Sequence, residues 1–328
     1  MWYFCRPWVS THGPNPRVSE RRRSRGRDVH GILLLDKPPG MGSNSALQRV
    51  KRIYQAKKAG HTGSLDVQAT GLLPICMGEA TKLSGFLLDS NKHYHATCKL
   101  GVITSTGDAA GEQIEVHEVP DFSTHRIEQA LEQFRGEIKQ VPPMYSALKH
   151  KGQRLYKLAY QGIEVKREAR SITIHQLALL HFEKDIFEID VYCTKGTYIR
   201  TLAEDIGRAL GCGAHVTALR RLGAGPFKAD QMISMDEIEE TAKRGLEALD
   251  QFILPMDNAI EDMQSIELAG SVAYYLCQGQ AVVVPHAPTS GWLRIYDADH
   301  EFIGVGEVLD DGRVAPRRLI GKDKRKTT

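Results

Sequence analysis

Residues 60–71 read GHTGSLDVQATG, and we expect the rest of the chain to be organised around this stretch. Its three glycines, two threonines and one histidine leave too few apolar side chains for a helix face or a strand, so the composition predicts a loop. Amphipathic segments at 43–58 and 78–88 should hold this loop on either side. Its single carboxylate, Asp66, can act as a nucleophile or a base, or it can cap the next turn, which is the commoner role of such an aspartate.

The stretch continues to residue 82 as LLPICMGEATK, and residues 61–82 together resemble the catalytic motif of the TruB family. Bacterial members of this family are tRNA pseudouridine synthases that make pseudouridine 55 in the T-loop of tRNA. The resemblance implies that Asp66 is the nucleophile and that no cofactor or metal takes part. The family usually has Pro-Leu after this aspartate, whereas this chain has Val67 and Gln68. Valine restricts the preceding backbone less than proline does, so we expect a less rigid loop.

Other segments resemble further motifs of the family, in the same order along the chain. They supply the remaining candidate residues, which are Lys37 in LDKP (35–38), Tyr94 in the alternating segment 92–100, Tyr198 and Arg200 in KGTYIRTLAEDIG (195–207), and Leu219 in segment 213–222. In segment 101–111, GVITSTGDAAG, Ser105 stands where the family usually has an aspartate, while Asp108 is retained.

The resemblance implies a role for each candidate around a uridine turned out of the RNA stack. Arg200 would pair with Asp66 and keep it ionised and oriented. Tyr94 would stack on the base and help to remove the C5 proton. Tyr198 and Leu219 would line the pocket for the base.

Each assignment has a structural alternative. His61 would either help to hold the rearranged T-loop or cap its own turn. Lys37 would lie near the active centre or be a solvated turn lysine. Without the motifs, Tyr94 would be a half-buried strand residue, and Arg200 a solvated side chain in the first turn of a helix.

Basic and aromatic side chains alternate around VPPMYSALK, residues 141–149, which also resembles the family. Lys149, Lys151 and Arg154 lie near Tyr145 and Tyr156 in the sequence, and this pattern suits contacts with the backbone and bases of RNA. We therefore predict RNA binding here.

Positive charge gathers at the two ends of the chain. Residues 1–28 carry seven basic and two acidic side chains, residues 313–328 carry seven basic and one acidic, and the whole chain has a net charge of only +3. The first segment is either a solvated tail or an arm that contacts phosphates. Residues 1–20 do not resemble a signal peptide and are an extension or the product of an upstream start.

Composition limits the class of protein. With 328 residues and 41% hydrophobic content, the chain can form one large domain and a small one. No apolar run reaches eighteen residues, so we predict no membrane span. The six cysteines are scattered, without a C-x-x-C pair or a His/Cys cluster, which indicates a reducing cytoplasm and no structural metal. No exposed apolar stripe or coiled coil is evident, so we expect a monomer.

These observations predict an α+β protein with a basic arm (1–28), a catalytic domain (29–255), a small β domain (264–321) and a basic tail (322–328). The resemblance implies the pseudouridine synthase fold, a mixed and mostly antiparallel sheet flanked by helices, followed by a PUA-like RNA-binding domain. Periodicity predicts helices at 43–58, with Ser43 or Asn44 as cap, and at 78–88, 123–134 and 235–252, and strands at 30–35, 92–100, 113–119, 171–182 and 186–193. In the β domain, candidate contacts to tRNA phosphates are Arg313, Arg317 and Arg318.

Two other functions stay open from the sequence. A non-catalytic tRNA-binding or tRNA-folding factor would use the same basic surface and would not need Asp66. A carboxylate-dependent nucleoside hydrolase would need Asp66 together with a second acid nearby. The loop at 60–71 contains no second acid, so we rank the hydrolase last.

Overall fold

The computed structural model describes residues 26–321. The first 25 residues of the expected arm, including Arg21–Arg25, and the expected tail 322–328 lie outside this range. Within it, the Arg27 guanidinium makes two hydrogen bonds to the carboxylate of Asp250. This ion pair fixes the point where the described chain begins to the end of helix α7 (Leu246–Asp250).

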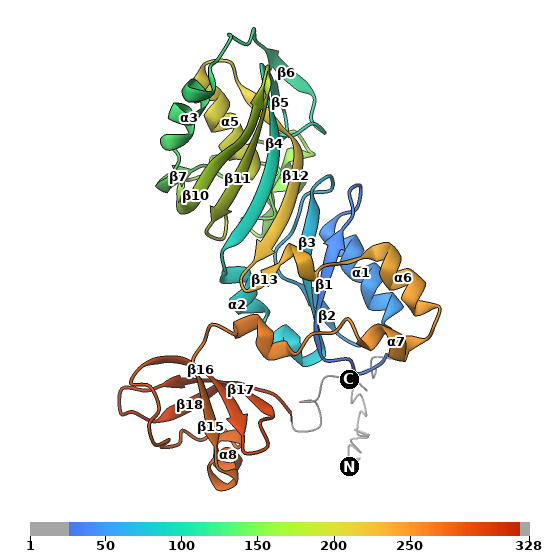
Figure 1. Cartoon of the computed structure of the whole chain (residues 1–328), viewed down its shortest axis with the longest axis vertical. Helices are drawn as coiled ribbons and strands as arrows, with labels where there is room; N and C mark the ends of the chain where they lie inside the picture. The colour runs from blue at the N-terminus through green and yellow to red at the C-terminus, as the bar shows by residue number, and fades with distance from the viewer. Residues whose placement is uncertain (1–25, 322–328) are drawn as a thin grey trace, which may run out of the picture.

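A large mixed sheet forms the body of the molecule, in the strand order β14-β1-β3-β12-β4-β11-β10-β7 (Figure 1). Its pairs are antiparallel except β1 with β14 and β3 with β12. The predicted mixed, mostly antiparallel sheet is therefore confirmed. Its strands are β1 Gly31–Lys37, β3 Thr70–Met77, β4 Lys92–Leu100, β7 Gly136–Gln140, β10 Arg170–Glu183, β11 Ile186–Cys193, β12 Ala214–Ala224 and β14 Ile233–Ser234, with β2 Ala59–His61 and β13 Phe227–Lys228 beside β3 and β12.

Helices pack on both halves of this sheet (Figure 1). Helices α3 (Thr124–Glu132) and α5 (Ile199–Leu210) lie beside strands β4, β10, β11 and β12, and the apolar side chains of these elements form one core cluster. Helices α1 (Ser43–Ile53) and α6 (Met235–Ala242) pack with α7 against β1 and β3 in a second cluster. Smaller elements are β5 Val102–Thr104, β6 Gln113–Val116, β8 Lys149–His150, β9 Gln153–Arg154, α4 Leu155–Ala159, and the 3₁₀ turns η1 Gly78–Lys82, η2 Ala229–Gln231 and η3 Met256–Ile260.

The predicted loop 60–71 is shorter than expected, because both of its ends belong to strands. Strand β2 pairs antiparallel with β3, with Ala59 opposite Met77 and His61 opposite Ile75. The remaining loop, residues 62–69, is thus closed at its base by a ladder of hydrogen bonds. We call these eight residues the catalytic loop.

Some predicted helix bounds are wrong. Segment 78–88 divides into the 3₁₀ turn η1 and helix α2 (Ser84–Asp89), and segment 235–252 is interrupted by Gly245, whose φ of +108° is outside the helical range. Helix α1 ends at Ile53, and Gln55 follows with a φ of +51°. Gly42 is its N-cap residue, so neither Ser43 nor Asn44 has that role.

The C-terminal part is a four-stranded sheet, β15-β16-β17-β18, with helix α8 against it (Figure 1). It has a core of its own, and it contacts the body through Phe302, Val305 and Ile320, which share a cluster with α2 and η3. The ring of Trp292 meets Phe86 of α2 edge to face at 5.5 Å. Its elements are β15 Ser265–Leu268, α8 Gly270–Cys277, β16 Gly291–Asp297, β17 Phe302–Val308 and β18 Val314–Leu319.

Between residues 26 and 321, no helix is long and apolar enough to cross a membrane. Four of the five cysteines in this range, Cys76, Cys98, Cys193 and Cys212, are buried free thiols.

Candidate active site

Asp66 lies in the catalytic loop and forms an ion pair with Arg200. The two carboxylate oxygens meet two nitrogens of the guanidinium: Nε is 2.9 Å from Oδ2, and Nη2 donates to Oδ1 over 3.2 Å. The Asp66 side chain remains 42% exposed. Loss of solvent around it raises the pKa of this carboxyl, while the charge and the hydrogen bond of Arg200 act to lower that pKa. The pair holds the carboxylate in one orientation and leaves part of it open.

Arg200 is fixed from all sides. It stands in the first turn of α5, its side chain is 5% exposed, and Nη1 and Nη2 donate to the carbonyl oxygens of Thr106 and Tyr145 at 2.7 and 2.8 Å. The carboxylate of Asp108 lies 3.9 Å from Nε. A solvated surface arginine, the structural alternative from the sequence, is therefore wrong.

Asp108 gives the site a second acid that the loop sequence does not contain. Its Oδ1 accepts hydrogen bonds from the hydroxyl of Thr106 and from the amide of Ala110. These bonds hold the Asp108 side chain in a tight turn. Asp108 therefore has structural contacts of its own besides its approach to Arg200. Sequence spacing did not place it beside Asp66.

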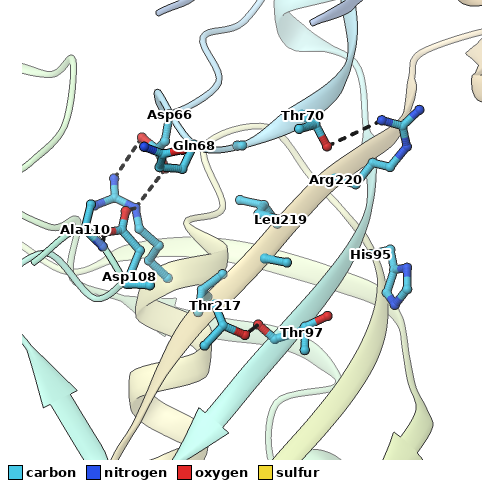
Figure 2. A pocket seen from close by; sticks show the side chains of 15 residues that line it. Asp66, Gln68, Thr70, His95, Thr97, Asp108, Ala110, Thr217, Leu219 and Arg220 are labelled. Carbon is cyan, nitrogen blue, oxygen red and sulfur yellow. Dashed lines mark hydrogen bonds and ion pairs between the residues drawn. The ribbon is translucent and has the colours of Figure 1, made fainter. Parts of the chain in front are cut away.

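A cavity of about 520 Å³ opens beside this ion pair, a volume in the range of small-ligand pockets (Figure 2). Asp66 and Asp108 lie on one side of it, while strands β4 and β12 form the other side. Thr217 of β12 donates to the Thr97 carbonyl over 3.1 Å. Other residues that line the cavity are Gln68, Ala69, Thr70, His95, Ala109, Ala110, Arg200, Val216, Ala218, Leu219 and Arg220. Of the predicted pocket residues, Leu219 thus lines it.

Tyr94 lies on the opposite face of β4 from His95 and does not line this cavity. Strand β4 alternates strictly, so Tyr94 points with Ala96 into the core and is 9% exposed. Burial raises the pKa of its phenol. It is more deeply buried than the half-buried strand residue of the structural alternative.

Tyr198 is the residue before helix α5, and its backbone is held by Gln140. The Gln140 amide donates to the Tyr198 carbonyl over 3.0 Å and accepts from the Tyr198 amide over 2.8 Å. Burial raises the pKa of the Tyr198 phenol. The buried Gln140 was not among the residues predicted from the sequence, because its partner is a backbone segment 58 residues away.

Lys37 is completely buried, so the solvated turn lysine is also wrong. Its ammonium donates to the carbonyls of Pro38, Met41 and Val67 at 2.8, 2.6 and 3.2 Å. Burial lowers its pKa to about 8. Lys37 therefore binds the catalytic loop one residue after Asp66.

Ser43 holds the loop one residue before Asp66. Its hydroxyl accepts from the Leu65 amide over 2.7 Å and donates to the Leu65 carbonyl over 3.0 Å. The side chain of Val67 is 51% exposed. The departure from the Pro-Leu pattern thus places a solvent-facing side chain in a loop that is anchored on both sides of Asp66.

His61 ends strand β2 with its Nδ1 buried and without a hydrogen-bond partner among the described residues. Burial, with the charges of Arg221 and Arg154, lowers its pKa, which favours the neutral imidazole.

The predicted contact residues Lys149 and Arg154 pair with each other in the β8–β9 hairpin, and Lys151 lies at its tip with a φ of +47°.

Aromatic rings border this hairpin. Tyr160 meets Tyr145 and Tyr156 edge to face at 5.6 and 6.3 Å.

In the small β domain, Arg313 pairs with Asp311 and Arg317 with Glu307, and Arg318 donates to a backbone carbonyl. Within residues 26–321, no three His, Cys, Asp or Glu side chains are arranged to bind a metal ion.

Comparison with known proteins matches almost the whole described chain. Residues 51–199 match the N-terminal domain of TruB family pseudouridylate synthases, residues 200–261 match the C-terminal domain of tRNA pseudouridylate synthase B, and residues 265–320 match the C-terminal domain of pseudouridine synthase II TruB. The chain belongs to the TruB family of pseudouridine synthases. The family predicted from the motifs is therefore confirmed, and with it the assignment as an isomerase.

Relatives in several bacteria are similar over nearly their full length. The chain is 57% identical to tRNA pseudouridine synthase B of Nitrosococcus oceani over 303 residues, which are 92% of this chain and 98% of that one. It is 55% identical to the enzymes of the same name in Coxiella burnetii (strain RSA 493), over 90% of this chain and 96% of that one, and in Pseudomonas aeruginosa (strain UCBPP-PA14), over 90% and 97%.

Solved structures confirm the predicted pseudouridine synthase fold. A chain in the crystal structure of a Cbf5-Nop10-Gar1 complex superposes with a TM-score of 0.71 at 26% identity, covering 90% of this chain and 87% of that one. A chain from an H/ACA RNP bound to a substrate RNA containing 2′-deoxyuridine also gives 0.71, at 23% identity and 95% coverage of both.

Proposed function

We propose that this TruB-family enzyme isomerises uridine 55 in the T-loop of tRNA to pseudouridine, with Asp66 as the nucleophile. The observation that carries the proposal is the two-point ion pair of Asp66 and Arg200 beside a cavity, in a chain whose relatives are named tRNA pseudouridine synthase B. A carboxylate that is oriented and partly open is what nucleophilic attack requires.

The uridine must leave the T-loop stack before the reaction, because stacking hides both its glycosidic bond and C5. Asp66 then attacks the ribose C1′ or the uracil ring, or assists formation of a glycal. The uracil is released, turned, and rejoined to the ribose through C5. Arg200 holds Asp66 ionised. Tyr94 helps to remove the C5 proton from the inner face of the sheet, where Asp66 acts electrostatically on its phenol. Leu219 and Tyr198 position the base, and no cofactor or metal takes part.

The tRNA would lie against basic side chains on both sides of the catalytic loop. Lys37 anchors that loop, and His61 would support the rearranged T-loop from its end of β2. We assign RNA contacts to Lys149, Lys151 and Arg154 in the catalytic domain (29–255), and to Arg313, Arg317 and Arg318 in the small β domain (264–321). We propose that the protein acts as a monomer in the cytoplasm.

Product analysis separates this proposal from the two alternatives. Unmodified tRNA is incubated with the protein, digested to nucleosides, and separated by mass and retention. Pseudouridine without free uracil supports isomerisation. Free uracil would support a hydrolase that uses Asp66 with Asp108, and unchanged uridine with intact tRNA binding would support a non-catalytic factor. Asp66→Asn is treated in the same way, and Arg244→Gln, an exposed change beyond the end of α6, is its matched control.

A further inference from the structure

Arg221 has the largest of the fully buried side chains in the described part of the chain, at 1% exposed. Within residues 26–321 it forms no ion pair with a carboxylate, unlike its neighbour Arg220, which binds Asp36 through two nitrogens. A buried guanidinium is costly unless other acceptors replace water. Its acceptors therefore indicate why an arginine stands there.

One of these acceptors lies in the catalytic loop before Asp66, and the other lies in strand β3 after the loop. Nε donates to the Leu72 carbonyl over 2.6 Å, and Nη2 donates to the Gly63 carbonyl over 3.1 Å. One planar group thus joins the strand that follows Asp66 to the loop residue three positions before it. The fork of donors on arginine can bind two carbonyls at fixed directions, which a lysine cannot reproduce.

The backbone of Arg221 is as closely packed as its side chain. It is opposite Gly71 in the parallel pair of β12 and β3. A Cβ on Gly71 would lie 2.2 Å from the Arg221 carbonyl oxygen. Strand β12 therefore approaches the base of the catalytic loop with no room for adjustment.

Arg221 also lies beside Tyr94. The two residues are cross-strand partners in β12 and β4, so their side chains share the inner face of the sheet. The charged or titratable groups that act on the Tyr94 phenol are Arg221, the thiol of Cys193 on β11, and Asp66. Burial raises the pKa of this phenol, while the charge of Arg221 and a hydrogen bond from it act to lower that pKa.

We propose that Arg221 is a positioning residue for the isomerisation. Its guanidinium ties the catalytic loop to strand β3 and also interacts with Tyr94. Asp66 and Tyr94 thereby keep a constant geometry although they lie on different elements. This inference rests on the proposed function, since it assigns Arg221 to the same reaction.

The test uses the full-length protein with Arg221→Met, which removes the charge and both bonds, and Arg221→Lys, which keeps the charge. Tyr54→Phe is the control, because it removes another buried hydrogen bond, to the Leu249 carbonyl, in the α1 cluster. Single-turnover tritium release from tRNA that contains 5-tritiated uridine gives the rate. Loss of loop geometry should lower it about 10²-fold in Arg221→Met, with tRNA affinity unchanged. Arg221→Lys should be intermediate.

The pH–rate profile separates positioning from general stability. The Arg221 charge acts to lower the pKa of Tyr94, so removal of that charge should raise this pKa. The alkaline end of the rising limb of the pH–rate profile should then move to higher pH. This shift should be absent when Tyr94 is also replaced by phenylalanine. A parent-like rate in Arg221→Met overturns the proposal. The proposal is also overturned by a second result. In that result Arg221→Met loses rate without a shift of its pH–rate profile, and Tyr54→Phe shows the same loss of rate at an equal loss of Tm.

If Arg221→Met does not fold, Arg221→Lys decides. A reduced rate at parent-like tRNA affinity and Tm supports the proposal, and a parent-like rate overturns it. Absence of tritium release from the parent protein is a different outcome, which contradicts the proposed function and this inference with it.

Discussion

Arg200 binds both carboxylate oxygens of Asp66, although 134 residues separate them. The arginine is itself held by two backbone carbonyls and is nearly excluded from solvent. The orientation of Asp66 is therefore determined by α5 as well as by its own loop.

Removal of the Arg200 charge should change how activity depends on pH. In Arg200→Met, the pKa of Asp66 should rise further, because the guanidinium acts to lower it. Activity needs the ionised carboxylate, so the acidic limb of the pH–rate profile should move to higher pH. Arg200→Lys keeps the charge but loses the two-point geometry, so the limb should move less while the rate falls about 10²-fold. An acidic limb that is the same in all three proteins would contradict this account of Asp66.

The burial of Lys37 predicts a rise of stability with pH. Its pKa is about 8 in the folded protein, whereas the ordinary pKa of a lysine is 10.5, so the unfolded chain binds more protons between these values. Stability should therefore rise through that window, by about 2 kcal/mol between pH 7.5 and 9.5 relative to Lys37→Met. Urea unfolding of both proteins at the two pH values measures it. A difference in unfolding free energy that stays constant with pH would show that Lys37 keeps the ordinary pKa of a solvated lysine in the folded protein.

Val67→Pro should restore the usual family residue without loss of activity. The Val67 side chain faces solvent, its carbonyl accepts from Lys37, and no hydrogen bond from its amide is present in the described residues. Proline keeps that carbonyl and restricts the unfolded chain, so stability should rise by about 0.4–1 kcal/mol. Thermal unfolding and the tritium assay measure the two effects. A large fall in rate would mean that the loop needs the freedom that valine gives.

Gly71→Ala should destabilise the protein by about several kcal/mol, because the added methyl group overlaps a neighbouring strand and the backbone is left-handed at this position. Gly71 has a φ of +97°, and its added Cβ would overlap the Arg221 carbonyl. Gly60→Ala, in β2, is the matched control because open space surrounds that position. Equal unfolding free energies for the two variants would contradict the close approach of β3 and β12.

Regular alternation made some strands predictable from the sequence. The bounds of β4 (92–100) and β11 (186–193) were predicted correctly, because one face of each meets the core and the other is polar. Strand β3 was not predicted. Both of its faces are buried, so its sequence has no alternation from which a strand could be recognised.

The site could be predicted only where a motif carried it. Asp66 and Arg200 came from the resemblance, and the structure brings them together. Lys37 also came from a motif, but its contacts were not predicted. Lys37, Ser43 and Arg221 act on backbone carbonyls or amides, and a sequence does not show which carbonyl a side chain will meet. Those contacts, and the roles of Ser43 and Arg221, therefore needed the fold.

The most direct test of the account is tritium release from tRNA in which uridine 55 alone carries tritium at C5, compared between the parent protein and Asp66→Asn. Asparagine keeps the shape of the side chain and removes the nucleophilic charge. The account predicts release by the parent, none by Asp66→Asn, and equal affinity of both for tRNA. Release by Asp66→Asn at the parent rate would contradict the assignment of Asp66 as the nucleophile.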